Sequence, residues 1–232
     1  MPDYGLPKWK LALDILLLLL MAPAILLFFV GISAYIKLVS RGPVFFLQER
    51  VGYRGRPFKL YKFRSMHHNA DTGVHRQHLA GLIQGNKPMQ KLDARGDKRL
   101  IPLGWILRTS GLDELPQLIN VMKGEMSIIG PRPSTRYELE MFQPWHKERL
   151  LALPGLTGLW QVSGKNKTTF EEMIQLDVFY ARNQSLWLDL RILVRTFPAL
   201  LEQVKDHLKS STSAKVTAVK EPERKGTLMF RS

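Results

Sequence analysis

One uninterrupted apolar run near the amino end of the chain constrains its fold more than any other feature. Residues 15–36, ILLLLLMAPAILLFFVGISAYI, contain no charged side chain. As one straight helix this run would be about 33 Å long, which is enough to cross a bilayer core of about 30 Å. A cleaved signal peptide is a poor alternative, because the run is long for one, follows Asp14 directly and lacks a small-x-small cleavage pattern before Lys37. The sequence therefore predicts attachment to a membrane.

The charges around this run leave two topologies open. Lys8 and Lys10 precede it and further basic residues follow it, so the positive-inside bias favours neither orientation of a spanning helix. A helix that enters the membrane and returns would keep both basic flanks at the anionic leaflet. Pro23 offers the place to turn, because a break there leaves pieces of about eight and fourteen residues, and neither piece could span. A kinked single-pass helix is the alternative, since membrane helices tolerate proline.

The composition narrows the class of partner. The 232 residues include 34 Lys and Arg against 20 Asp and Glu, a formal net charge of +14. Polyanions are therefore expected partners: nucleic acid, phosphorylated small molecules or an anionic membrane surface. The absence of cysteine excludes disulfides, thiolate metal sites and catalysis by Cys.

The residues after the apolar run predict a hairpin and several short helices. Two β-favouring runs flank a turn rich in Gly and Arg, which predicts a β-hairpin over 43–66. Residues 67–98 have low apolar density and predict a loop with one short helix around 75–83. Helices are predicted over 102–109 and from Asp113 to Gly124, followed by a strand in MSIIG.

The last part of the chain predicts further helices around one strand. A helix over about 135–153 precedes PGLTGLWQVSG, whose glycines and β-branched residues indicate turns and a strand. Thr168 or Thr169 begins the next helix, because a glutamate follows each at capping-box spacing. The final helix, 185–209, has an apolar side that suits either the membrane interface or the core. That side consists of Trp187, Leu190, Leu193, Val194 and Phe197. Strands alternate with helices too irregularly for a doubly wound sheet, so the predicted fold class is mixed α/β.

Two adjacent carboxylates, Asp113 and Glu114, stand between Gly111 and Pro116. If Asp113 is the N-cap or first residue of its helix, Pro116 falls in the first turn, where its missing N–H costs little. The helix amino end would keep the carboxylate ionised and could hold phosphate oxygens nearby, although the same pattern would also serve only as a cap. Basic residues near predicted turns could gather diphosphate charge beside the pair, or could simply be solvated. They are Lys62, Arg64, Arg108 and Arg132.

Three long segments follow the apolar run: GPVFFLQERVGYRGRPFKLYKFRSM, LRTSGLDELPQLINVMKGEMSIIGPRP and PGLTGLWQVSGKN. In this order they resemble the bacterial sugar transferase family, the monotopic polyprenyl-phosphate phosphoglycosyl transferases. The likeness covers residues 8–200 apart from an insertion near 75–95. It implies transfer of a sugar 1-phosphate from a nucleotide diphosphate sugar, UDP-linked, to a polyprenyl phosphate. The reaction would take place on the cytoplasmic face of the bacterial inner membrane and begin exopolysaccharide or another cell-surface glycan.

The resemblance also implies roles for individual residues. Asp113 would be the nucleophile that attacks the phosphorus next to the sugar, forms an acyl phosphate and releases the nucleoside monophosphate. Glu114 would orient the site or assist proton transfer, and Mg²⁺, held in part by Asp113, would screen the diphosphate. The four basic residues named above would hold phosphates. Asp177 and Tyr180, one helical turn apart, would border the sugar nucleotide.

The family likeness favours the re-entrant form of the apolar run, with its break at Pro23. Ala22 stands where the family often has Ser before this proline, which removes one partner for a freed carbonyl. Gly111 likewise replaces a common hydroxyl residue, for which Ser110 is the expected substitute. The predicted catalytic domain is helix-rich, with a β-hairpin and amphipathic interfacial helices. The predicted domains are a re-entrant membrane segment (1–41), the phosphoglycosyl transferase domain (42–209) and a mobile basic tail (210–232).

Several other interpretations have less support in the sequence. The four histidines of 67–78 lack acidic or Cys partners at a recognised metal-ligand spacing, which argues against a zinc site. GLWQVSGKNKTT does not match the spacing of a Walker motif, and no RNA-binding fingerprint accompanies the basic residues, so nucleic acid is not an expected partner. The alternative function is a non-enzymatic, membrane-anchored basic protein that binds nucleic acid or anionic lipid. The sequence leaves the sugar, the glycan pathway and the oligomeric state open, with a homodimer as one option.

Overall fold

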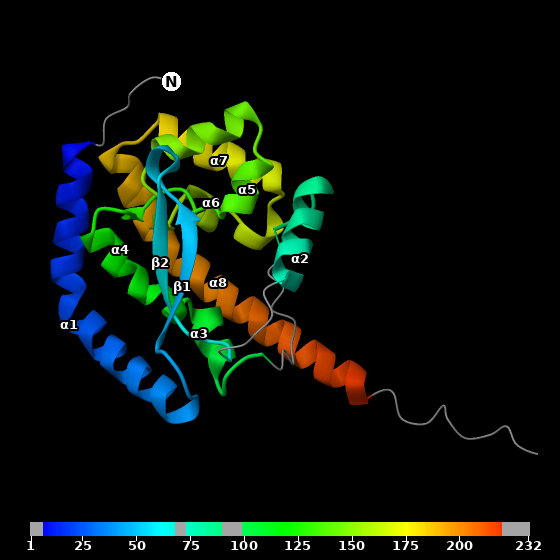
Figure 1. Ribbon diagram of the computed structural model, residues 1–232. Coiled ribbons are helices and arrows are strands. Elements are labelled where there is room, and N and C mark those ends of the chain that lie inside the picture. The colour runs from blue at the N-terminus through cyan, green and yellow to red at the C-terminus, as the bar shows by residue number, and fades with distance from the viewer. Residues whose placement is uncertain (1–6, 68–72, 90–98, 220–232) are drawn as a thin grey trace, which may run out of the picture.

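The computed structural model describes residues 7–67, 73–89 and 99–219 and has a mixed α/β fold rich in helices (Figure 1). Its α-helices are α1 (Lys8–Val39), α2 (Gly73–Gln84), α3 (Gly104–Ser110), α4 (Leu118–Met122), α5 (Arg136–Glu140), α6 (Leu159–Val162), α7 (Phe170–Arg182) and α8 (Leu186–Val219). Short 3₁₀ segments lie between them: η1 (Tyr53–Gly55), η2 (Leu112–Gln117), η3 (Pro144–Leu151) and η4 (Lys165–Lys167). The strands are β1 (Phe45–Val51), β2 (Pro57–Phe63), β3 (Ser127–Ile129) and β4 (Gly155–Thr157). The predicted fold class and the predicted hairpin are confirmed.

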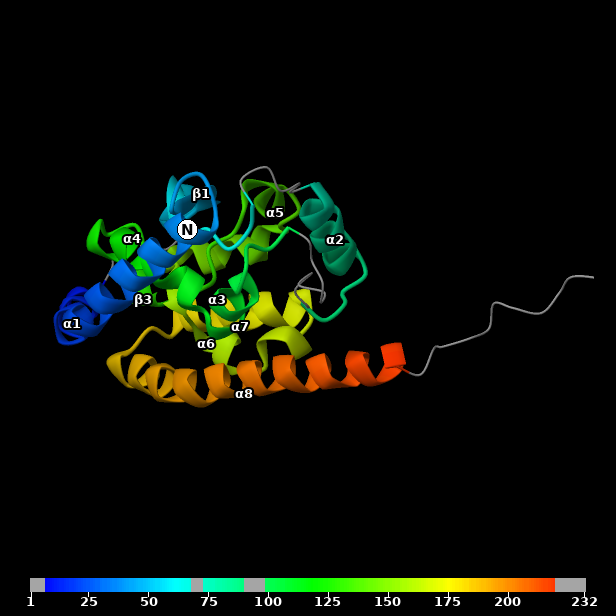
Figure 2. The same ribbon diagram turned by 90° about the horizontal axis from the view of Figure 1, so that it is seen from below.

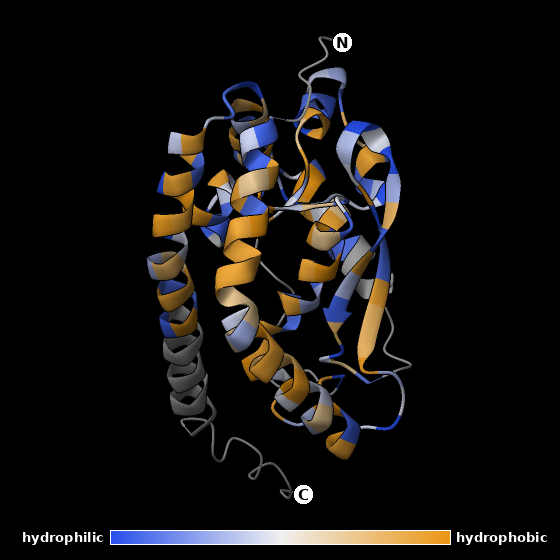
Figure 3. Cartoon of the chain, turned by 90° about the vertical axis from the view of Figure 1, so that its left-hand side faces the viewer, coloured by the Kyte–Doolittle hydropathy of each residue, from blue (hydrophilic) through white to orange (hydrophobic). Residues whose placement is uncertain are grey.

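The apolar run forms α1, a continuous helix of 32 residues that contains Pro23. The predicted break at Pro23 is therefore a bend and not an interruption: Figures 1 and 3 show the helix bending about midway along its length. An internal proline removes one backbone hydrogen bond and crowds the preceding turn. The other hydrogen bonds of a long helix are kept, so the helix can continue after the proline with a bend. By its length and composition α1 could cross a membrane.

The amino end of α1 is fastened to the rest of the protein by buried polar groups. Nζ of Lys10 donates to Oδ2 of Asp189 at 2.7 Å and to the hydroxyl of Tyr180 at 2.8 Å. One turn further along α1, Oδ1 of Asp14 accepts from Oγ of Ser127 and from the backbone N–H of Ile128, both at 3.0 Å. Lys10 and Asp14 are 2% and 5% exposed. The first turns of an otherwise apolar helix therefore pack against β3, α7 and α8.

The other end of α1 is held by apolar packing. Ile32 and Ile36 are buried in one cluster with Phe63 of β2 and with residues of the segment around α3. Between the two ends the helix presents large exposed apolar side chains, visible as the orange stretch of α1 in Figure 3. They include Leu16, Leu19, Leu20, Met21, Leu26, Leu27, Phe28 and Val30.

β1 and β2 pair antiparallel, with Phe45 opposite Phe63 and Val51 opposite Pro57. The turn between them needs a left-handed residue: Arg54 has φ 54° and Gly55 has φ 78°. The side chains of β2 that face inward, such as Leu60, join the central core. The hairpin thereby becomes one wall of the domain (Figure 1).

β3 and β4 pair in parallel, with Ser127 opposite Gly155 and Ile129 opposite Thr157. The two backbones approach so closely that a Cβ on Gly155 would lie 2.1 Å from the backbone nitrogen of Gly130. Only glycine fits there, which explains the glycine in PGLTG. The residues just after β3 contact η3, because Arg149 of η3 donates to the carbonyl of Arg132.

α7 is the buried centre of the domain, and Thr169, one of the two predicted caps, begins it with a complete capping box to Glu172. The segment outside the family likeness docks on this helix. Leu79 and Leu82 of α2 share a buried cluster with Met173 and with other side chains of α7, so this part of the insertion is integrated in the core.

α8 lies along one side of the protein (Figure 2). Its inner face places Ile192 and Leu193 against the core. Its outer face exposes Trp187 by 70%, Val194 by 74% and Phe197 by 69%, so most of the predicted apolar side faces outward. Leu193 is the exception among the residues predicted for that side.

Three predicted boundaries differ from the structure. The helix expected over 135–153 is divided into α5 and η3, because Pro144 follows the first turns and cannot donate a helical hydrogen bond. The helix expected from Asp113 begins as the 3₁₀ segment η2. α8 continues to Val219, beyond the expected start of the tail at 210, and residues 220–232 of that tail lie outside the described residues.

Candidate active site

The Asp113–Glu114 pair lies on a tight turn between α3 and η2. Gly111 ends α3 in the left-handed conformation, φ 77°, and is the N-cap of η2, so a residue with a side chain would be strained there. Oγ of Ser110 donates to the carbonyl of Ile106 at 2.7 Å, and its role as a substitute for a hydroxyl at 111 stays a prediction. Asp113 is thus the second residue of the 3₁₀ helix η2, one position later than the N-cap or first position considered from the sequence.

The two carboxylates differ in their surroundings. Asp113 is 7% exposed, whereas the side chain of Glu114 is 33% exposed and its Oε1 lies 3.0 Å from Nζ of Lys62. Lys62 projects from β2, where it is paired with Phe46 of β1. The structure therefore brings one predicted basic residue directly beside the pair, and contact of Lys62 with a phosphate stays a prediction.

The position of the pair against the hairpin is fixed by Asn120 of α4, which is fully buried. Its Oδ1 accepts from the backbone N–H of Tyr61 at 3.1 Å, and its Nδ2 donates to the carbonyl of Lys59 at 2.8 Å. The side chain of Asn120 thus forms hydrogen bonds with two backbone groups of β2 and joins this strand to α4, which follows η2. Sequence reasoning missed Asn120, and the available signal was a single amide in the apolar run LINVM.

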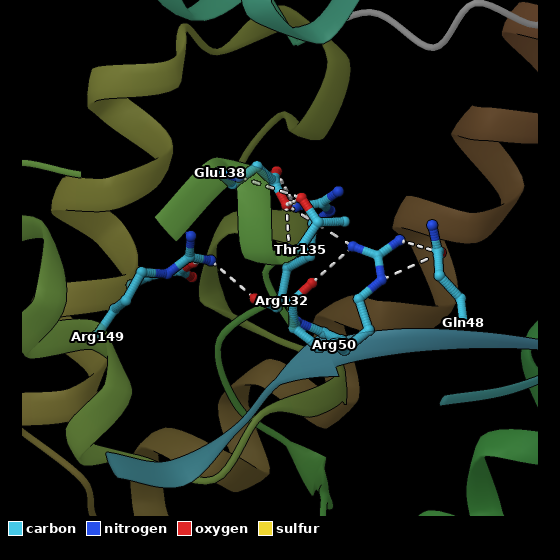
Figure 4. Close-up of polar contacts among 8 residues, drawn as sticks. Gln48, Arg50, Arg132, Thr135, Glu138 and Arg149 are labelled. Atoms are coloured by element: carbon cyan, nitrogen blue, oxygen red, sulfur yellow. Dashed lines mark hydrogen bonds and ion pairs between the residues drawn. The ribbon is translucent and has the colours of Figure 1, made fainter. Parts of the chain in front are cut away.

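Arg132, which follows β3, contacts a buried carboxylate that the sequence analysis did not select. Its Nη1 donates to Oε1 of Glu138 at 2.8 Å, and Nη1 of Arg50 lies 3.8 Å from Oε2 of the same residue (Figure 4). The backbone N–H and the hydroxyl of Thr135 also donate to Oε2, at 2.5 and 2.8 Å. Glu138 is therefore both half of a capping box and the counter-charge of two arginines, and the spacing Thr-x-x-Glu could have identified it.

These charges shift one another's pKa values. Burial acts to raise the pKa of Glu138, but Arg132, Arg50 and the hydrogen bonds from Thr135 outweigh it and lower the pKa to about 2. Burial and the charge of Arg132 lower the pKa of Arg50 to about 10, while Glu138 and Glu114 act in the opposite direction. Because Glu114 contributes to the pKa of Arg50, the arginine cluster is electrostatically coupled to the carboxylate pair.

We expect Glu138→Gln to lower the free energy of unfolding by about 3 kcal/mol near neutral pH, since each pKa unit corresponds to about 1.4 kcal/mol. The folded pKa lies below the unfolded value of 4.5, so this contribution is complete above pH 4.5 and is lost as the pH falls toward 2. Denaturant unfolding at pH 7, 4.5 and 3 should show the difference from wild type shrinking with acid. Glu140→Gln on the exposed side of α5 is the matched control, and a difference independent of pH would contradict the assignment.

Next to this cluster, Arg149 of η3 and Asp177 of α7 form a fully buried ion pair. Nη2 of Arg149 donates to Oδ2 of Asp177 and, at 2.9 Å, to the carbonyl of Arg132. Burial raises the pKa of Asp177 to about 6, although the charges of Arg149 and Arg132 oppose the rise. The structure places Asp177 inside the domain, where it supports the segment that carries Arg132, and its contact with the sugar nucleotide stays a prediction.

Two more predicted residues occupy structural positions. Arg64 is 4% exposed and donates to the carbonyls of Ser40 and Arg41 at 2.9 and 2.6 Å, because the last carbonyls after α1 lack helical partners. The hydroxyl of Tyr180 is buried, donates to Oδ1 of Asp189 at 2.7 Å and belongs to the contacts that hold α1. These contacts give Arg64 and Tyr180 structural roles, and the phosphate contact of Arg64 and the nucleotide contact of Tyr180 stay predictions. Arg108 lies half-buried in the last turn of α3, and its role stays a prediction.

The donor set at the pair can be compared with the requirements of Mg²⁺. Among residues 7–67, 73–89 and 99–219, no group of three or more His, Asp and Glu side chains converges as a preformed metal site. Mg²⁺ commonly retains waters and binds through one or two carboxylates together with substrate phosphates. Asp113 and Glu114 fit a site of that kind, which the substrate would complete.

Comparison with known proteins places these residues in a family. A model of the family described as bacterial sugar transferase matches residues 7–203. The chain is 36% identical over 191 residues to the exopolysaccharide production protein ExoY of Sinorhizobium fredii, covering 82% of this chain and 84% of ExoY. It is 38% identical over 213 residues to the UDP-glucose:undecaprenyl-phosphate glucose-1-phosphate transferase of Caulobacter vibrioides, covering 87% of this chain and 73% of that protein. The galactosyl transferase CpsE of Streptococcus agalactiae is 44% identical over 166 residues, which are 69% of this chain and only 35% of CpsE.

Proposed function

The chain belongs to the bacterial sugar transferase family, and on this basis we propose that it transfers a sugar 1-phosphate from a UDP-linked sugar to a polyprenyl phosphate. The product would start an exopolysaccharide or another cell-surface glycan. Relatives with these names support the substrates: one is a UDP-glucose:undecaprenyl-phosphate glucose-1-phosphate transferase and another is an exopolysaccharide production protein. The observation that carries the proposal is the buried Asp113 beside the ion pair of Glu114 and Lys62 within the matched residues.

The proposed reaction has two displacements at one phosphorus atom. A carboxylate oxygen of Asp113 attacks the phosphorus next to the sugar, and the bond from that phosphorus to the bridging oxygen of the diphosphate breaks, so the nucleoside monophosphate leaves. An oxygen of polyprenyl phosphate then attacks the same phosphorus, and the bond to Asp113 breaks, which regenerates the carboxylate. Low exposure of Asp113 keeps water from competing for the acyl phosphate.

The neighbouring side chains would supply charge and orientation. Lys62, 3.0 Å from Glu114, can place positive charge beside the incoming diphosphate while the ion pair holds Glu114 in one orientation. Arg132 is held by Glu138 and is 22% exposed in its side chain, so part of the guanidinium can meet a phosphate. We propose that Asp113 and Glu114 would hold Mg²⁺, which when bound would screen the diphosphate charge.

The test of this function is a transfer assay with the purified protein. UDP-linked sugars, Mg²⁺ and undecaprenyl phosphate in detergent should yield nucleoside monophosphate and a lipid-linked sugar diphosphate in equal amounts. A panel of UDP-sugars identifies the donor. A protein that folds and binds membranes but releases no monophosphate from any of them would refute the proposal.

For the membrane segment we propose a re-entrant topology with the catalytic domain at the cytoplasmic leaflet of the bacterial inner membrane. Both ends of α1 contact the same domain: Lys10 bonds to Asp189 near one end, and Ile36 is buried near the other. A helix that crossed the bilayer would place its ends on opposite sides, about 30 Å apart. The bend midway and the exposed apolar middle suit a helix that dips into one leaflet, and the exposed apolar face of α8 suits the membrane interface.

Cysteine labelling should distinguish the two topologies. We expect neither Lys8→Cys nor Arg41→Cys, in a protein without cysteine, to be labelled by an impermeant maleimide in intact cells. Both should be labelled once the cells are opened, because both residues are exposed at the ends of α1. Lys59→Cys on the hairpin is the matched control for the cytoplasmic side. Labelling of only one of the two helix-end variants in intact cells would establish a spanning helix.

A further inference from the structure

Gln203, in the middle of α8, joins α3 and η4, which are far apart in the sequence. Its Nε2 donates to the carbonyl of Thr109 at 2.8 Å, and its Oε1 accepts from Nζ of Lys165 at 2.9 Å. The side chain is half-buried and uses both its donor and its acceptor. Neither its position nor its contacts followed from the sequence patterns.

The carbonyl that Gln203 binds belongs to the last turn of α3. Carbonyls in the last turn of a helix lack a partner within the helix and need another donor. Oγ of Ser110 serves the carbonyls of Ile106 and Leu107, and Nε2 of Gln203 serves that of Thr109. Two side chains, one of them from α8, therefore define how α3 ends.

The end of α3 determines where Asp113 lies. Thr109 is four residues before Asp113, and the left-handed Gly111 between them is the point where the chain changes direction. Leu200 of α8 also lies next to this turn, because a Cβ added to Gly111 would be 3.8 Å from Cδ2 of Leu200. One turn of α8, Leu200 to Gln203, thus supports the backbone that presents the nucleophile.

We propose that Gln203 is a positioning residue for the transfer reaction: its amide N–H holds the Thr109 carbonyl and thereby fixes the turn that places Asp113. The inference rests on the proposed function of Asp113. The hydrogen bond that Oε1 of Gln203 accepts from Lys165 orients the amide group so that Nε2 faces Thr109. In-line attack on phosphorus requires close control of the attacking oxygen, and displacement by about 1 Å can cost up to about 100-fold in rate.

Substitutions at 203 can separate the effects of its two hydrogen bonds, the one to Thr109 and the one from Lys165. Glu at 203 keeps the acceptor for Lys165 but loses the donor to Thr109, Met loses both, and Lys keeps a donor and loses the acceptor. We expect Gln203→Glu and Gln203→Met to lower kcat about tenfold with little change in KM for the sugar nucleotide. Gln203→Lys should retain more activity than either, because it can still donate to the carbonyl.

The matched control is Glu202→Gln on the neighbouring position of α8. Glu202 forms an exposed ion pair with Lys167 and has no contact with the turn among the described residues, so kcat should stay at the wild-type value. If the side chain at 203 only filled space, kcat would depend on the size of the side chain and on the stability of the variant. It would not depend on the presence of a hydrogen-bond donor. Thermal unfolding of each variant checks that the comparison is made between folded proteins.

The outcomes distinguish this inference from the proposed function. If the wild-type protein releases no nucleoside monophosphate, the proposed function fails. If the wild type is active and Gln203→Glu has the same kcat, the positioning role of Gln203 fails and the function stands. Loss of activity in Gln203→Lys equal to that in Gln203→Glu would likewise overturn the role of the Thr109 bond.

Discussion

Asp113→Asn is expected to lower sugar-phosphate transfer by at least about 10⁴-fold, because loss of a catalytic nucleophile or of its partner costs about 10⁴- to 10⁶-fold in kcat. The substitution keeps the shape of the buried side chain at the start of η2 but replaces the anionic oxygen with an amide. An amide oxygen is a weak nucleophile, and it does not give the acyl phosphate that polyprenyl phosphate must attack. The measurement is the release of nucleoside monophosphate under single-turnover conditions.

Intact-protein mass spectrometry gives an independent readout of the same step. Wild-type protein mixed with the sugar nucleotide in the absence of polyprenyl phosphate should gain the mass of one sugar phosphate, and Asp113→Asn should not. Glu114→Gln is the matched control: it should slow transfer by about 10²-fold but still form the adduct, because the nucleophile is intact. A fully active Asp113→Asn protein would exclude the covalent mechanism. A protein that only recruits nucleic acid or anionic lipid would release no monophosphate with either residue at 113, and its salt-dependent binding would not change with the substitution.

The elements that could be predicted from the sequence are those decided by nearby residues. The hairpin follows from two β-favouring runs and a Gly-rich turn, and the structure pairs them with Phe45 opposite Phe63. The start of α7 follows from the capping box between Thr169 and Glu172, which lies within one turn. The site pair was found in the same way, because Asp113 and Glu114 are adjacent between a glycine and a proline. In each case the deciding contacts span only a few positions in the chain.

The residues whose structural contacts could not be predicted have partners far away in the sequence. Tyr180 binds Lys10, 170 positions away, and Arg64 binds carbonyls 23 and 24 positions away, so no local pattern could show that these groups are used inside the fold. Glu138 could have been found as a cap through its near partner Thr135, but its role as a counter-charge depends on Arg50, which comes from the hairpin. Burial of a charged group is decided by tertiary packing, which a spacing rule does not contain.

The continuity of α1 illustrates a second limit. Proline removes one hydrogen bond, but whether a helix ends or bends there depends on what the two halves contact. In this protein Lys10 and Asp14 are held near one end and Ile32 and Ile36 near the other, so the helix is fixed to the domain on both sides of Pro23. The sequence therefore shows where the helix could break, at Pro23, but tertiary contacts decide whether it breaks or bends there.

The second large effect is expected at the buried ion pair of Arg149 and Asp177. Asp177→Ala should lower the free energy of unfolding by about 3–5 kcal/mol, because it leaves a buried guanidinium without its counter-charge. Arg149→Met should cost less, since the remaining carboxylate can take up a proton whereas a guanidinium cannot lose one. The pKa of Asp177 is already raised to about 6 with Arg149 present, and it should rise further without it. Arg149→Met should therefore become less stable as the pH rises through and above 6, the sign expected for an acid whose folded pKa is raised.

A second ion pair between the same two elements is the matched control. Arg182 of α7 lies 2.6 Å from Glu148 of η3, but both side chains are partly exposed, so Glu148→Gln should change stability by about 1 kcal/mol or less. Denaturant unfolding of the single variants and of Arg149→Met combined with Asp177→Ala completes the comparison. The double variant should be more stable than the sum of the single losses predicts, because removal of both charges leaves no unpaired charge in the core. If Asp177→Ala lowers the free energy of unfolding no more than Glu148→Gln does, the carbonyl of Arg132 and nearby groups must be enough to stabilise the charge of the Arg149 guanidinium. In that case Asp177 would be free to serve the substrate after all.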